Sequence, residues 1–157
     1  MSEPIVNVFV VGAEKAGTTW LYKYFESHPD IFVSPTKEVG YFCAHDSSMR
    51  TRTEYETQPL DYYHRFFKKR NNESIVAEIM PMYLCDPMSP ERIYKYNPNA
   101  KIIILLRDPI KRAYSHFWMA KWKEGLDLDF NNLVFGDDKR FLGRGKYADQ
   151  IERYFKC

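Results

Sequence analysis

A short glycine-containing segment has the residue types and spacing of an anion-binding loop. Gly12 and Gly17 stand at the interval found in phosphate-binding loops, between an apolar run and a stretch with helical periodicity. In that context backbone N–H groups and the positive end of the helix dipole attract an anion. The segment therefore predicts a phosphate site, and the alternative is a glycine-rich turn without a ligand.

The lysine of this loop is displaced from its usual position. In enzymes that use nucleoside triphosphates, a lysine follows the second glycine and reaches the β- and γ-phosphates. Here Thr18 takes that place, and the lysine is Lys15. A lysine inside the loop lies over the group attached to the first phosphate, whereas Thr18 and Thr19 can hydrogen-bond that phosphate. We therefore expect a derivative of a nucleoside monophosphate, with no demand for magnesium or another metal.

A second basic motif follows the most apolar strand candidate. Residues 101–106 deliver Arg107 to the carboxyl end of that strand, where open α/β sheets bind ligands. Arg112 and Ser115 follow within two helical turns, and arginine binds phosphate oxygens through paired hydrogen bonds. The motif predicts a second phosphate site, although a surface salt bridge explains Arg112 equally well.

Strands and helices alternate along the chain in a way that places both motifs. We expect strands at residues 5–11, 31–33, 74–79 and 101–106, and helices at residues 18–27, 60–70, 89–96, 109–124 and 147–155. The alternation predicts a P-loop-like α/β fold with three layers, in which helices flank a central parallel sheet. The nearly continuous apolar run at residues 5–11 predicts a central strand.

Composition limits the function classes. The 157 residues are 45% hydrophobic, which predicts one domain over residues 1–157. The net charge of +2 argues against a general nucleic-acid binder. The basic segment 65–70 leaves a heparin- or nucleic-acid-binding module as an alternative, but a solvated helix face explains it better.

The sequence shows neither a membrane span nor a secretory signal, because the first apolar run is interrupted by Asn7 and preceded by Glu3. Three widely spaced cysteines indicate reduced thiols in a cytoplasmic protein. The four histidines lack the spacing of metal ligands. We therefore expect no structural metal.

Segments 15–19 and 107–115 resemble the two donor-binding motifs of the sulfotransferases that use 3′-phosphoadenosine 5′-phosphosulfate (PAPS), particularly the bacterial and heparan sulfate branch. The resemblance runs from about Val8 to Tyr154. It implies transfer of a sulfuryl group from PAPS to a hydroxyl or amine of a small-molecule or carbohydrate acceptor. The donor-binding residues that it implies are Lys15, Ala16, Gly17, Thr18, Thr19, Trp20, Arg107 and Ser115.

The resemblance also implies two catalytic residues. Segment 37–42 is similar to the one that carries the catalytic glutamate of this branch, so Glu38 is the expected general base, and a solvated loop carboxylate is the alternative. Lys15 is the expected stabiliser of charge on the leaving oxygen. Lys37 is either a helper or a surface partner of Glu38, and Glu78 is either an acceptor-site carboxylate or a strand-end residue.

Two other functions stay open at this point. A small P-loop kinase agrees with the loop but not with Thr18, and a non-catalytic, truncated sulfotransferase remnant is the second alternative. Members of the family continue well beyond the last helix, so we expect C-terminal elements to be missing and the chain to be a fragment or a shortened relative. The sequence specifies neither the acceptor nor an oligomeric state.

Overall fold

A computed structural model of the chain describes residues 5–46, 49–125, 129–130 and 139–157. Its centre is a parallel sheet with the strand order β2-β3-β1-β4. The strands are β1 (Val8–Gly12), β2 (Ile31–Val33), β3 (Ile75–Ile79) and β4 (Lys101–Ile104). β1 lies between β3 and β4, which confirms that the first apolar run forms a central strand.

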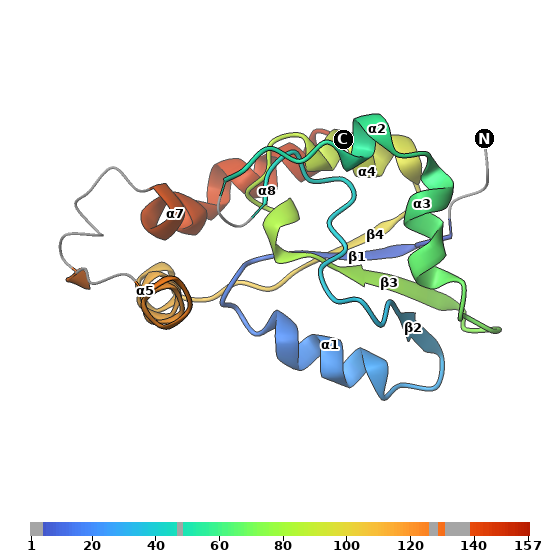
Figure 1. Ribbon diagram of the computed structural model, residues 1–157, viewed down its shortest axis with the longest axis horizontal. Coiled ribbons are helices and arrows are strands. Elements are labelled where there is room, and N and C mark those ends of the chain that lie inside the picture. The colour runs from blue at the N-terminus through green and yellow to red at the C-terminus, as the bar shows by residue number, and fades with distance from the viewer. Residues whose placement is uncertain (1–4, 47–48, 126–128, 131–138) are drawn as a thin grey trace.

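Helices cover both faces of this sheet, as the expected three-layer fold requires (Figure 1). α1 (Thr18–Glu26) lies on one face, and α3 (Leu60–His64), α4 (Ser89–Tyr96) and α8 (Tyr147–Phe155) lie on the other (Figure 1). The other helices with described bounds are α2 (Glu54–Thr57), η1 (Arg65–Phe67), η2 (Pro81–Tyr83), α5 (Pro109–Glu124), α7 (Lys139–Leu142) and η3 (Gly143–Gly145).

The core forms two apolar layers, one on each face of the sheet. Successive side chains of a strand point to opposite faces. Val8 and Val10 of β1 therefore pack in the cluster that includes Tyr22 of α1, whereas Phe9 and Val11 pack with the aromatic residues of the other layer. All five residues of β1 are buried, which explains its continuous apolar sequence.

Element boundaries differ from expectation, most clearly in three elements. The first strand begins at Val8 and extends to Gly12, and the helix expected over residues 60–70 ends at His64 and continues as a short 3-10 helix. β4 stops at Ile104, next to the point where the register of its pairing with β1 shifts. These shifts leave the element order unchanged.

The parallel strands bring their carboxyl ends to one edge of the sheet, where the loop from β1 to α1 lies. A Cβ atom on Gly12 would lie 2.5 Å from Cβ of Leu84, so only glycine allows this close approach. α5 begins near the same edge, where the Asp108 carboxylate accepts the Lys111 N–H at 2.8 Å. Gly125 ends α5 with φ +64°, as the sequence predicts.

Candidate active site

A cavity of about 590 Å³ opens at this edge of the sheet. Its walls come from the β1–α1 loop, the segment after β2, the turn after β3 and α5. The lining residues are Glu14, Lys15, Gly17, Thr18, Thr19, Lys37, Glu38, Pro81, Met82, Ser115, His116, Met119 and Lys123. Its volume is in the range of small-molecule and cofactor sites.

The glycine loop forms the floor of the cavity and ends at the N-terminus of α1. Gly17 is the N-cap residue, with φ +97°, a conformation that glycine adopts without strain. The first N–H groups of a helix have no partner within it, so those at the start of α1 are available to an anion. A Cβ atom on Gly17 would meet nothing within 4 Å, so the space beside the loop is open.

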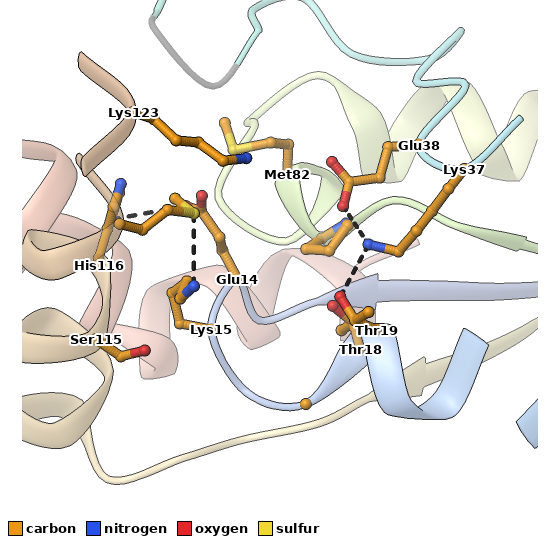
Figure 2. A pocket seen from close by; sticks show the side chains of 13 residues that line it. Glu14, Lys15, Thr18, Thr19, Lys37, Glu38, Met82, Ser115, His116 and Lys123 are labelled. Atoms are coloured by element: carbon orange, nitrogen blue, oxygen red, sulfur yellow. Dashed lines mark hydrogen bonds and ion pairs between the residues drawn. The ribbon is translucent and has the colours of Figure 1, made fainter. Parts of the chain in front are cut away.

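Lys15 extends from this loop into the cavity. Figure 2 shows it between the α5 residues on one side and the Lys37–Glu38 pair on the other. Its Nζ lies 3.5 Å from Sδ of Met119. Burial lowers the pKa of Lys15, and the positive charges of Lys123, Arg107 and Lys37 lower it further against the opposing effect of Glu14. Such a concentration of positive charge favours binding of an anion.

Glu38 faces the same cavity from the segment after β2. Nζ of Lys37 lies 2.7 Å from Oε1 of Glu38 and 3.2 Å from Oγ1 of Thr19, so it bridges the carboxylate and the glycine loop (Figure 2). The Glu38 side chain is 45% exposed, which leaves it accessible to a second substrate. The structure therefore brings together the two residues expected to be catalytic, Lys15 and Glu38.

The second basic motif divides between several environments. Ser115 lines the cavity, and Arg107 lies at its margin, where Nη1 donates to the main-chain oxygen of Lys15 at 3.1 Å. Arg112 is fully buried and donates to the carbonyl of Phe141. The interpretation of Arg112 as a phosphate ligand is therefore wrong, because its guanidinium serves the packing of α5 against α7.

Besides Arg107 at the margin, two residues of the expected donor-binding set lie outside the cavity lining. Ala16 packs against the core behind the loop. Trp20 is 71% exposed on α1 and stacks on Tyr24, with ring centroids 5.8 Å apart. Their part in donor binding stays a prediction.

Six lining residues were not expected to belong to the site, and two of them, Pro81 and Met82, come from the turn after β3. Met119 and Lys123 follow Ser115 at intervals of four, so helical periodicity on α5 could have indicated them. Glu14 and His116 had no such local signal, because their link is tertiary: the carboxylate of Glu14 pairs with Arg144 and lies 3.7 Å from Nδ1 of His116. Burial lowers the pKa of His116 to about 4, so its ring is neutral at pH 7.

Within the described ranges, no helix is both long and apolar enough to cross a membrane. The same residues include no group of three or more histidine, cysteine, aspartate or glutamate side chains arranged to hold a metal ion.

Comparison with known proteins gives a consistent result. A solved structure of a sulfotransferase from Alicyclobacillus acidocaldarius superposes with a TM-score of 0.83 and 31% identity, covering 99% of this chain and 69% of that one. Membrane-associated sulfotransferase kil1 of Dictyostelium discoideum is 31% identical over 137 residues, which are 82% of this chain and 27% of that protein.

Bifunctional heparan sulfate N-deacetylase/N-sulfotransferase 3 of Homo sapiens is 31% identical over 165 residues, which are 92% of this chain and 18% of that protein. The chain thus spans about a quarter or less of the length of these two relatives. Residues 7–132 match the model of the sulfotransferase family. The fold, the matched residues and these similarities show that the chain belongs to the sulfotransferase family.

Proposed function

We propose that the protein transfers a sulfuryl group from PAPS to a hydroxyl or amine of an acceptor. The observation that carries this proposal is that Lys15, the N-terminus of α1 and Glu38 line the same cavity. A cation and helix N–H groups bind an anionic donor, and a carboxylate opposite them can accept a proton from the second substrate.

The residues present fit the donor at both of its anionic ends. Lys15, Thr18 and Thr19, with the N–H groups at the start of α1, would hold the 5′-phosphosulfate. Ser115 and Arg107 would hold the 3′-phosphate. Ser115 lines the cavity from α5, and Arg107 precedes α5 and bonds to the glycine loop at Lys15. PAPS brings the activated sulfuryl group, whose transfer needs positioning and stabilisation of charge.

In the proposed reaction each catalytic residue has one task. Glu38 accepts the proton of the acceptor hydroxyl or amine as the new bond to sulfur forms. Lys15 stabilises the negative charge on the bridging oxygen as its bond to sulfur breaks. Lys37, paired with Glu38 and bonded to Thr19, keeps the two halves of the site together.

We propose a carbohydrate or another small molecule as the acceptor. The heparan sulfate activity named for one relative supports this class, as does the positive charge of Lys37 and Lys123 at the cavity. We also propose a cytoplasmic location, supported by Cys43, Cys85 and Cys157 being free thiols, as reducing compartments maintain them.

Titration calorimetry with adenosine 3′,5′-bisphosphate, AMP and ATP tests the donor. We expect the bisphosphate to bind most tightly, because it alone engages both phosphate sites. Equal affinity for all three nucleotides would overturn the proposal. A magnesium-dependent rise in ATP affinity would instead favour the kinase, and the lack of a cooperative thermal transition would favour a non-catalytic remnant.

A further inference from the structure

The peptide group between Val39 and Gly40 is held at both ends by charged side chains. Its N–H, on Gly40, donates to Oε1 of Glu78 at 3.0 Å. Its carbonyl, on Val39, accepts from Nη2 of Arg52 at 3.1 Å. A carboxylate on the donor end and a guanidinium on the acceptor end complement the dipole of the peptide, and charge-assisted hydrogen bonds of this kind are the stronger ones. We call this arrangement the peptide clamp.

Glu78 is a core residue and lies outside the cavity. It is 2% exposed on β3, and its carboxylate also accepts the hydroxyls of Tyr83 at 2.8 Å and Tyr63 at 2.6 Å. Burial raises the pKa of Glu78, and its hydrogen bonds from Tyr63, Tyr83 and Gly40 N–H oppose that rise. Of the two roles considered from the sequence, that of an acceptor-site carboxylate does not fit, because Glu78 contacts neither the cavity nor solvent; it is the penultimate residue of β3.

An apolar side chain at position 78 would avoid the cost of burying a carboxylate in this aromatic layer. The described residues include no lysine or arginine in an ion pair with Glu78, and the more distant positive charge of Arg52 offsets only part of that cost. What the carboxylate provides is a fixed acceptor for the Gly40 N–H, and the two tyrosine hydroxyls keep that acceptor in place.

Arg52 completes the clamp from the opposite side. Glu54 holds its guanidinium through two hydrogen bonds, of 2.9 and 3.2 Å, and the bond from Arg52 holds the pKa of Glu54 below its usual value. The guanidinium lies directly against Gly40, where a Cβ atom would come within 2.6 Å of Nη1. Gly40 also has φ +67°, a conformation that favours glycine.

The clamp directly follows Glu38 in the chain, and Glu38 is a non-glycine residue with a positive φ. Glu38 has φ +63°, a left-handed conformation that is strained for a residue with a Cβ atom. Its direction into the cavity depends on that conformation, because the side chain itself is half-exposed and contacts Lys37. Fixing the next peptide group stabilises the left-handed turn that aims Glu38.

We propose that Arg52 and Glu78 are positioning residues that hold Glu38 in the cavity through the Val39–Gly40 peptide. The inference rests on the proposed function, since Glu38 is its general base. Neither residue lines the cavity, so both act through Glu38 alone.

Hydrogen exchange of the Gly40 amide tests the clamp without any activity. The variants are Glu78→Gln, which keeps the shape but removes the charge, and Arg52→Met, which keeps the apolar stem. Arg50→Met is the matched control, since Arg50 is an exposed arginine two positions away and bonds to Asp46. We expect exchange at Gly40 to accelerate about tenfold in both variants, while exchange of the β1 amides stays unchanged in them. In the control, exchange at Gly40 should match that of the wild type. Unaltered exchange in both would overturn the clamp.

Turnover tests the positioning role. Arg52→Met should lower kcat about tenfold with donor affinity within about twofold, because misaiming a catalytic group slows chemistry rather than binding. In a Glu38→Gln background the same substitution should cost nothing further. An unchanged kcat despite faster exchange, or an equal loss in the Glu38→Gln background, would overturn the role.

The two readouts also separate this inference from the proposed function. A wild-type chain that binds no bisphosphate and transfers no sulfuryl group would contradict the proposed function and the positioning role together, whereas the exchange rate at Gly40 would still decide the clamp. Should Glu78→Gln fail to fold, Arg52→Met decides both questions, since its side chain is partly exposed.

Discussion

Arg107 donates a hydrogen bond to the main-chain oxygen of Lys15 across 3.1 Å, although 92 positions separate the two residues in the chain. The contact forms because β1 and β4 are parallel neighbours, with Gly12 paired to Ile104, so that the segments after both strands leave the sheet together. The two motifs predicted to bind phosphate are therefore adjacent, as one bisphosphorylated nucleotide would require.

Replacing Arg107 tests the 3′-phosphate site. Arg107→Ala should weaken binding of adenosine 3′,5′-bisphosphate by about 10- to 100-fold, the usual range for losing a hydrogen bond to a charged group, and should largely spare AMP. Calorimetry measures both affinities. Arg50→Ala, which changes an exposed arginine outside the cavity, should leave both unchanged. A preserved preference for the bisphosphate would remove Arg107 from the site.

Replacing Lys15 tests the stabilisation of the leaving group. Lys15→Ala should reduce kcat by about 10²-fold or more and donor affinity far less, because the contact strengthens as charge develops. Steady-state kinetics and donor titration give the two quantities. Lys23→Ala, on the exposed face of α1, is the control. A loss of donor affinity with kcat unchanged would mean that Lys15 only binds.

Replacing Glu38 tests the general base. Glu38→Gln keeps the size of the side chain but cannot accept the proton, so turnover should fall by about 10²- to 10⁴-fold while donor binding is retained. Glu26→Gln, an exposed carboxylate on α1, should retain full turnover. Full activity in Glu38→Gln would assign the proton to another acceptor.

His116 predicts a specific dependence of stability on pH. Its pKa is about 4 in the folded protein, lowered first by burial and then by Arg144, Arg112 and Arg140, with Glu14 opposing. The unfolded state, with a pKa near 6.5, takes up the proton first as the pH falls, so stability is complete above pH 6.5 and is lost toward pH 4.

The measurement for His116 is denaturant unfolding at pH 7.5 and pH 5. Wild-type protein should lose more free energy of unfolding over this interval than His116→Gln does, by on the order of 2 kcal/mol. The comparison between the two proteins cancels the titration of groups that they share. Equal losses would show that His116 titrates normally in the fold.

The sequence by itself predicted the four strands, the longer helices and both motifs, because each depends on near neighbours. The apolar run before Gly12, the Asp108-Pro109 start of α5 and the glycine at its end are local signals, and the structure confirms all three. The parallel order of the strands then follows, since strand–helix–strand units permit few arrangements.

Only the tertiary structure decided which charged side chains face the cavity and which are buried. Arg107 and Arg112 belong to one motif, yet the first lies at the cavity margin and the second is enclosed by α7. Glu78, for which the sequence left open the role of an acceptor-site carboxylate, instead accepts the Gly40 N–H from within the core. These outcomes depend on packing between segments far apart in the chain, a relationship that no local pattern of residues encodes.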